Sequence, residues 1–276
     1  MQSPVVSVEW LFENRHNPEL IILDASLQKP VADPLLQKDT AKIPGSIFFD
    51  IENVFSDKQH PLPHMMPSAE TFTHEAQLLG INQQSIIVVY DNIGVYAAPR
   101  AWWMFRAMGH EQVYVLNGGL PQWKKAGFSC SEAYAQPLKK GDFIASYQPS
   151  LITAQPAVAA ALLSNDIIVV DARSPERFVG KAPEPRKGLK GGHMPNAVNI
   201  YFEQLLNGNI LKEKPALEDI FNAVADREQL IIFSCGSGIT ACITALGAAI
   251  AGYKHLSVYD GSWCEWGSLP GTPVIS

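Results

Sequence analysis

The chain of 276 residues contains much of its own pattern twice. Residues 85–123 and 229–266 each run through an apolar stretch, a glycine-containing loop, a helix-like stretch and a second short apolar stretch. Each then ends in a Gly-Gly or Gly-Ser turn and a tryptophan. In this alignment Asp91 stands opposite Cys235. Self-similarity on this scale predicts a tandem duplication.

The segments upstream agree in the same order, because 19–26 matches 166–174 and 42–54 matches 193–205. Each copy alternates β-rich apolar runs with helical patterns, which predicts an α/β fold of two tandem domains, each a parallel sheet flanked by helices. Runs such as IIVVY and LIIF are apolar throughout, as expected for strands covered on both faces.

Domain boundaries follow from the repeat and from a change in composition between the copies. Residues 131–151 show no clear period and carry polar, proline and glycine residues, which is typical of a linker. We predict a first domain over 1–130, a linker over 131–150 and a second domain over 151–276.

Composition and charge restrict the function classes. An apolar fraction of 47% with 17% charged residues describes a soluble globular protein. A net charge of −6 disfavours nucleic acid as the main partner. Apolar runs are too short to span a membrane, and the N-terminus lacks a basic stretch followed by an apolar one. We therefore expect a cytoplasmic protein without a membrane partner.

The four cysteines, at 130, 235, 242 and 264, are best considered one by one. No pair has the C-x-x-C spacing of a zinc or redox site, and we predict neither a disulfide framework nor a metal. The lone G-x-G after Cys235 is weak as a nucleotide motif, so no cofactor is predicted. Cys242 falls on an apolar helix, where core packing is expected. Cys130 and Cys264 lack a supporting pattern and are interpreted as incidental.

Cys235 follows an apolar strand that we expect to end at Ser234, and it precedes a helix. Ligands of open α/β sheets bind at such carboxyl ends of strands. Gly236 and Gly238 permit a backbone that turns successive N–H groups inward, and the helix dipole adds positive charge. Thiols placed in this way have lowered pKa values. The alternative is a small buried hydrophobic side chain, but the loop favours a nucleophile. The first copy carries Asp91 and is interpreted as inactive.

On these residues the chain resembles the tandem-domain rhodanese superfamily, in which only the second copy carries the active cysteine. C-G-S-G-I-T (235–240) with YDGSW (259–263) is similar to its 3-mercaptopyruvate sulfurtransferase branch in particular. PGSIFFDIE (44–52), residues 97–110 and PEPRKGLKGGHMPNAVNI (183–200) extend the resemblance over nearly the whole chain. Asn196 departs from the usual glycine of its turn; asparagine tolerates left-handed angles, so the turn should survive.

The resemblance implies a sulfurtransferase in which Cys235 takes sulfur from an anionic small-molecule donor as a persulfide and releases pyruvate. A thiol such as thioredoxin, or cyanide, then removes the sulfur. Gly236, Ser237, Gly238, Ile239 and Thr240 would cradle the persulfide.

Donor binding and proton transfer are implied for further residues. Arg177 of SPERF and Arg186 of PEPR would bind the donor carboxylate, with a salt bridge between Arg177 and a residue such as Glu176 as the alternative. Ser237, His64 and Glu52 would form a serine–histidine–acid set that supplies a proton, although His64 could equally be a histidine of the domain interface.

Three other functions remain open. Thiosulfate could be the main donor, although the thiosulfate-specific branch carries two basic residues where this chain has Gly236 and Ser237. The chain could be a non-catalytic rhodanese-like binding module, although the second copy keeps its cysteine. Phosphate ester hydrolysis is disfavoured because it requires an arginine six residues after the cysteine, where Ala241 stands.

Overall fold

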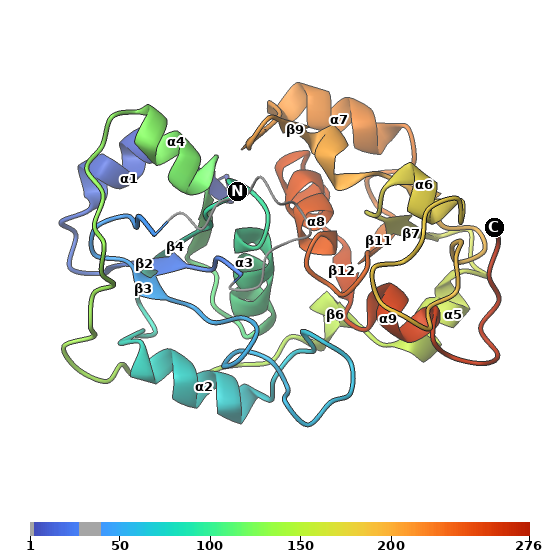
Figure 1. Cartoon of the computed structure of the whole chain (residues 1–276), viewed down its shortest axis with the longest axis horizontal. Helices are drawn as coiled ribbons and strands as arrows, with labels where there is room; N and C mark the ends of the chain where they lie inside the picture. The colour runs from blue at the N-terminus through green and yellow to red at the C-terminus, as the bar shows by residue number, and fades with distance from the viewer. Residues whose placement is uncertain (1–2, 28–39) are drawn as a thin grey trace. The chain divides into compact units, whose positions relative to one another are not determined.

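In a computed structural model, which describes residues 3–27 and 40–276, the chain divides into two compact units (Figure 1). The first unit comprises 1–58, 66–148 and 208–211, and the second comprises 59–65, 149–207 and 212–276. A short segment from each half of the chain, 59–65 or 208–211, is thus part of the unit formed mainly by the other half. Most of the expected linker, residues 131–148, belongs to the first unit, where the Ser131 and Ala135 amides donate to Lys42 and Ser46.

The first unit contains a five-stranded sheet in the order β1-β5-β4-β2-β3, and its pairs are parallel. The strands are β1 (Val5–Val6), β2 (Leu20–Asp24), β3 (Ile47–Phe48), β4 (Ile86–Tyr90) and β5 (Val113–Leu116). The helices are α1 (Val8–Asn14), α2 (Ala69–Leu78), α3 (Ala98–Ala107) and α4 (Gly119–Lys125). Ser7 and Ser68 cap α1 and α2, because their hydroxyls accept from the Trp10 and Thr71 amides.

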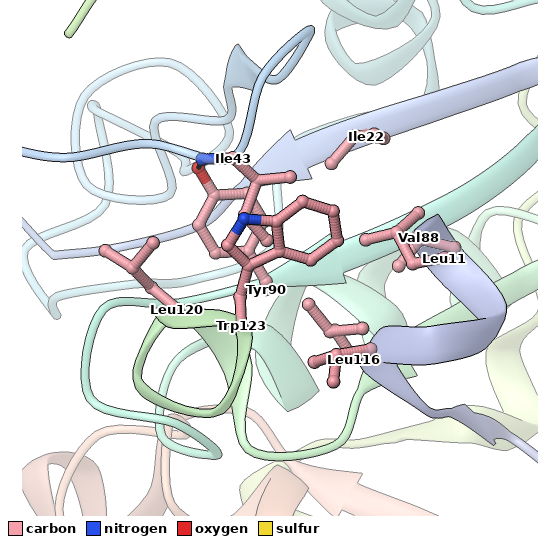
Figure 2. Packing of buried hydrophobic residues seen from close by; sticks show 9 residues of the cluster. Leu11, Ile22, Ile43, Val88, Tyr90, Leu116, Leu120 and Trp123 are labelled. Carbon is pink, nitrogen blue, oxygen red and sulfur yellow. Dashed lines mark hydrogen bonds between the residues drawn. The ribbon is translucent and has the colours of Figure 1, made fainter. Parts of the chain in front are cut away.

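One core of this unit lies between the sheet and helices α1 and α4, as Figure 2 shows. Val88 and Tyr90 of β4 alternate onto this face and meet Leu11 and Trp123. The buried Tyr90 hydroxyl accepts from the Ile43 amide at 3.2 Å and bonds the Ser46 hydroxyl at 3.0 Å, so its polar atom is satisfied inside an apolar layer.

The second unit repeats this topology with the strand order β6-β12-β11-β7-β8, again in parallel pairs. Its strands are β6 (Ile152–Thr153), β7 (Ile167–Asp171), β8 (Val198–Asn199), β11 (Leu230–Ser234) and β12 (Leu256–Tyr259). Two sheets with the same order and the same central strand confirm the predicted α/β fold. They also agree with a duplication in which β4 and β11 occupy equivalent places.

Helices cover both faces of the second sheet. They are α5 (Gln155–Ala161), α6 (Pro175–Phe178), α7 (Lys214–Asn222), α8 (Ala241–Ile250) and α9 (Ser262–Trp266). Ile232 of β11 belongs to the core shared with α5 and α9, whereas the next residue, Phe233, meets Phe221 of α7. This alternation buries β11 on both sides, as its continuous apolar sequence predicts.

Short elements complete the described residues: 3-10 turns at Pro149–Leu151 and Phe202–Leu205, and two-residue strands β9 (Leu206–Asn207) and β10 (Ile210–Leu211). Asn196 adopts φ 61° in the turn before β8, as expected for an asparagine in a glycine's place. None of the helices within 3–27 and 40–276 is long and apolar enough to cross a membrane.

The loop after β4 shows what this fold does with an anion at a strand end. The Asp91 side chain is fully buried, and its carboxylate accepts five backbone N–H groups. Oδ1 accepts from Ile93 at 3.0 Å and Gly94 at 2.8 Å, and Oδ2 accepts from Tyr96, Ala97 and Ala98 at 2.8–2.9 Å. The loop amides therefore converge on one negative group.

We expect Asp91→Ala to lower the free energy of unfolding by about 3 kcal/mol or more, because several buried N–H groups lose a charged acceptor. Urea unfolding followed by tryptophan fluorescence measures this. The exposed Glu132, in the same unit, provides the control: Glu132→Ala should change stability by no more than about 0.5 kcal/mol. Equal stability of the two variants would contradict the role assigned to the Asp91 carboxylate.

Candidate active site

Cys235 is the first residue after β11, and α8 begins at Ala241, as the sequence predicted. The side chain is 2% exposed. Three bonds hold this stretch of backbone to the β12–α9 segment. The Trp263 amide donates to the Cys235 carbonyl and the Cys264 amide to the Gly236 carbonyl, both at 2.9 Å, and the Cys235 amide donates to the Ser262 hydroxyl at 3.2 Å. The nucleophile candidate therefore lies on a fixed backbone.

Ser262 holds the Cys235 amide from a strained position. Its φ of 48° lies in the left-handed region, where non-glycine residues are uncommon. The equivalent residue of the first unit is Gly119, with φ 51°. The Ser262 hydroxyl also donates to the Tyr259 carbonyl at 2.8 Å, so a single Oγ joins the end of β12 to the start of the cysteine loop. A serine at a glycine's position is explained by these two bonds.

The two glycines of the loop serve different purposes. Gly238 has φ 83°, as a left-handed turn requires, and its amide donates to the Cys235 sulfur at 3.2 Å. Gly236 does not have a positive φ, and its lack of a side chain leaves room for the Arg177 guanidinium. A Cβ at this position would lie 3.3 Å from Nη2 of Arg177. The absence of a side chain lets a guanidinium approach the residue that follows the cysteine.

Ile239 and Thr240 complete the loop and start the helix. The Ile239 carbonyl accepts from the Cys242 amide and the Thr240 carbonyl from the Ile243 amide, both at 3.1 Å. Ile239 is buried. Cys242 is fully buried on α8, with its thiol 3.2 Å from the Gly238 carbonyl, in agreement with the expected core position. These residues hold the loop by packing and backbone bonds.

Ser237 and His64 meet as the resemblance implied, although they are 173 positions apart in the sequence. Nδ1 of His64 lies 3.1 Å from Oγ of Ser237. The segment 59–65 that carries His64 belongs to the second unit, and His64 has a left-handed φ of 61°. Glu52 belongs to the first unit, where its backbone carbonyl accepts from Lys58 Nζ at 2.7 Å. A catalytic role for Glu52 stays a prediction.

Arg177 lies on the short helix α6, and its ionic partner is Glu184. Nη2 is 2.6 Å from Oε2 of Glu184, and Nε is 3.3 Å from Oε1. Glu176, the partner suggested from the sequence, forms no ion pair within 3–27 and 40–276. The Arg177 side chain is 24% exposed, whereas that of Glu184 is almost fully buried.

Cys264 is buried, and its amide donates to the Gly236 carbonyl of the cysteine loop. Burial raises the pKa of its thiol, and the charges of Cys235 and Glu184 act in the same direction, whereas those of Arg186 and Arg177 lower it. The thiol therefore stays protonated at neutral pH. Both arginines named from the sequence thus act on a side chain next to Cys235, although Arg186 itself is exposed.

A buried ion network behind Arg177 was missed in the sequence. Arg173 is fully buried, and its guanidinium is 2.6 Å from Asp171, 2.8 Å from Glu184 and 4.0 Å from the centre of a Trp263 ring. Burial lowers the pKa of Arg173, but Asp171 and Glu184 together hold it above the ordinary value. PEPR contains Glu184, so the signal was present beside Arg186. Within 3–27 and 40–276, no group of three or more His, Cys, Asp or Glu residues is placed to hold a metal ion.

The sequence-family model of the rhodanese-like domain matches residues 7–126 and, a second time, residues 155–269. The chain belongs to the rhodanese family. Two matches in sequence agree with the two sheets of identical strand order, and the second match contains the Cys235 loop.

Named members of the rhodanese family resemble the chain over nearly its whole length. A 3-mercaptopyruvate sulfurtransferase of Escherichia coli strain K12 is 38% identical, with 98% of this chain and 96% of the relative covered. A mitochondrial thiosulfate/3-mercaptopyruvate sulfurtransferase of Arabidopsis thaliana is 39% identical over 99% of this chain and 78% of the relative. The crystal structure of the 3-mercaptopyruvate sulfotransferase SseA from Escherichia coli superposes with a TM-score of 0.82 at 36% identity, covering 95% of this chain and 99% of that one.

Proposed function

We propose that this chain is a sulfurtransferase that moves sulfur from 3-mercaptopyruvate through a Cys235 persulfide to an acceptor thiol, such as thioredoxin, or to cyanide. One observation carries the proposal: the Cys235 sulfur lies against a loop amide in the place where the first unit gathers five N–H groups around a carboxylate. The names of relatives at 38–39% identity support the same reaction.

The proposed first half-reaction needs only the donor and the cysteine. The Cys235 thiolate attacks the sulfur of mercaptopyruvate, an S–S bond forms, and the C–S bond of the donor breaks. The electron pair of that bond leaves on carbon as the enolate of pyruvate, which then takes a proton. In the second half-reaction the acceptor attacks the outer sulfur, the S–S bond breaks, and the Cys235 thiolate returns.

The persulfide is the species that the loop must hold between these steps. It carries its negative charge on the outer sulfur, one bond beyond the Cys235 Sγ. The Gly238 amide already donates to Sγ at 3.2 Å, and the loop runs into the first turn of α8. Inward amides in a buried site stabilise such an anion, as oxyanion holes do. In the first unit the Asp91 carboxylate occupies the corresponding place permanently.

We expect the purified chain, mixed with 3-mercaptopyruvate and desalted, to gain the mass of one sulfur atom. Cys235→Ser should gain none, because the oxygen nucleophile does not take up sulfur in this way. Intact-protein mass spectrometry measures the gain, and Cys130→Ser is the matched control because Cys130 is exposed and far from the loop in sequence. No gain in the native chain would favour a non-catalytic binding module.

Ser237 and His64 are proposed to deliver the proton that the enolate requires. Their 3.1 Å contact places an ionisable ring behind a hydroxyl on the persulfide loop, a geometry suited to proton transfer. Ser237 is mostly buried, so bulk water is a poor substitute. Glu52 is proposed as the acid that orients His64, on the resemblance alone.

Ser237→Ala separates the proton step from sulfur capture. We expect kcat with mercaptopyruvate to fall about a hundredfold, the scale of general acid catalysis, because the enolate loses its proton donor. With thiosulfate the leaving group is sulfite, which needs no proton on carbon, so kcat should change little. His64→Gln should show the same difference between donors. An equal loss with both donors would contradict the proton role.

Arg177 and Arg186 are proposed to bind the carboxylate of the donor. Arg177 reaches the loop beside Gly236, where its Nη2 lies 3.3 Å from the place of an absent Cβ. Thiosulfate-specific members are expected to carry a basic side chain at position 236. The Cβ atom of such a side chain would already contact the Arg177 guanidinium. Paired hydrogen bonds from an arginine suit a planar carboxylate.

We expect Arg177→Ala to raise KM for mercaptopyruvate about tenfold or more, since charge-assisted bonds to a carboxylate are lost. KM for thiosulfate, which carries no carboxylate, should rise less. Steady-state kinetics with both donors and cyanide as acceptor measure the two values. Equal increases would show that Arg177 supplies only general positive charge.

The second candidate is an enzyme that uses thiosulfate as its main sulfur donor. Two Arabidopsis thaliana relatives favour it, because their names mention both thiosulfate and 3-mercaptopyruvate. The same kinetic comparison decides between them. Phosphate ester hydrolysis lacks support, because Ala241 begins α8 where an arginine would be needed. A cytoplasmic location stays part of the proposal, to be tested by cell fractionation, because one relative is named mitochondrial.

A further inference from the structure

Glu184 is a buried carboxylate that two arginines share. Its side chain is 1% exposed. Oε1 accepts from Nη1 of Arg173 at 2.8 Å and from Nε of Arg177 at 3.3 Å, while Oε2 accepts from Nη2 of Arg177 at 2.6 Å. Both carboxylate oxygens are therefore occupied, and Arg177 is bound side-on through Nε and Nη2. A buried carboxylate in this geometry fixes the plane of the guanidinium.

The other end of the network is anchored in the sheet. Arg173 donates to both oxygens of Asp171, the last residue of β7, and to the Gly192 carbonyl at 2.8 Å. Asp171 pairs in register with Ser234, the residue before Cys235. The order Asp171, Arg173, Glu184, Arg177 thus leads from the sheet to the cysteine loop through alternating charges.

Side-on binding to Glu184 determines which part of Arg177 a donor can meet. The edge of the guanidinium formed by Nε and Nη2 donates to Glu184. The edge formed by Nη1 and Nη2 therefore remains as the one that can donate to a ligand. Nη2 lies next to Gly236, and the side chain keeps 24% exposure. A planar carboxylate can accept two parallel bonds from such an edge.

The same pairing lowers the general attraction of the site for anions. The Glu184 charge offsets that of Arg177, which weakens the non-directional pull on a dianion such as thiosulfate. Directional bonds from the open edge are retained. The arrangement should therefore favour shape-matched carboxylates over donors that rely on charge alone.

Resting on the proposed function, we infer that Glu184 is a positioning residue that orients Arg177 beside the cysteine loop and selects carboxylate-bearing sulfur donors over thiosulfate. Glu184 does not touch the donor. It acts through Arg177, and Arg173 and Asp171 keep it in place.

Glu184→Gln tests this inference by steady-state kinetics with mercaptopyruvate and thiosulfate. The glutamine side chain has one acceptor oxygen, whereas the carboxylate offers two oxygens to the two arginines. Its NH2 group would face the N–H groups of one arginine, so Arg177 loses its fixed orientation. We expect KM for mercaptopyruvate to rise about tenfold, the effect of roughly one lost charge-assisted bond, with kcat nearly unchanged. KM for thiosulfate should stay constant or fall, because the local positive charge increases.

Glu176→Gln is the matched control, since Glu176 is an exposed acid next to Arg177 whose replacement changes the net charge equally. It should leave both KM values unchanged. A double-mutant cycle adds a readout that a structural role would not move: with Arg177→Ala already present, Glu184→Gln should cause no further rise in KM for mercaptopyruvate.

Three results would overturn the inference. They are a ratio of KM for mercaptopyruvate to KM for thiosulfate that is the same in Glu184→Gln as in Glu176→Gln, a further rise in KM for mercaptopyruvate in the Arg177→Ala background, and a loss confined to kcat. If Glu184→Gln fails to fold, Glu184→Asp keeps the charge against Arg173 but is one methylene too short to hold both arginines, and should change the ratio in the same direction. No sulfur transfer by the native chain would overturn the proposed function as well, whereas native transfer with an unchanged ratio overturns only the inference.

Discussion

Backbone N–H groups that converge at the junction of a central strand and the following helix are the constraint on which the site depends. The fold makes this junction twice. After β4 it surrounds the Asp91 carboxylate, which accepts five amides. After β11 the corresponding place holds the Cys235 sulfur, to which the Gly238 amide donates at 3.2 Å. We propose that the second junction holds a temporary anion, the persulfide, where the first holds a carboxylate.

Neighbouring elements hold the backbone of the cysteine loop in place. Ser262 accepts the left-handed conformation of its glycine counterpart so that its hydroxyl can hold the Cys235 amide. The amides of Trp263 and Cys264 hold the next two carbonyls. The strain at Ser262 is thus offset by bonds to the backbone of Cys235 and Gly236.

The charged residues near the cysteine loop are paired, so that Arg177 has a defined orientation in addition to its positive charge. The positive segment 181–193 contains one acid, Glu184, and that residue is buried between two arginines. Its two bonds to Arg177 hold the Nε–Nη2 edge of that guanidinium. The proposed proton chemistry rests on other residues, Ser237 and His64, so donor binding and proton delivery can be measured by different kinetic constants.

The sequence predicted the features that depend on local pattern and repetition: both parallel sheets, the end of β11 at Ser234 and the start of α8. The contact between His64 and Ser237 followed from a resemblance, since no local rule joins residues so far apart. Glu184 was missed, and Glu176 suggested instead, because α6 ends at Phe178 and the following loop returns a distant acid to Arg177. Likewise, a left-handed Ser262 and the spatial role of Gly236 arise only from tertiary contacts.

A crystal structure of the chain after reaction with 3-mercaptopyruvate tests the central claim most directly. The account predicts a second sulfur on Cys235, with the amide nitrogens of residues 236–240 turned toward it at hydrogen-bonding distance, in the manner of the amides around Asp91. An added sulfur that points to solvent, or a loop whose amides face away from it, would contradict the account.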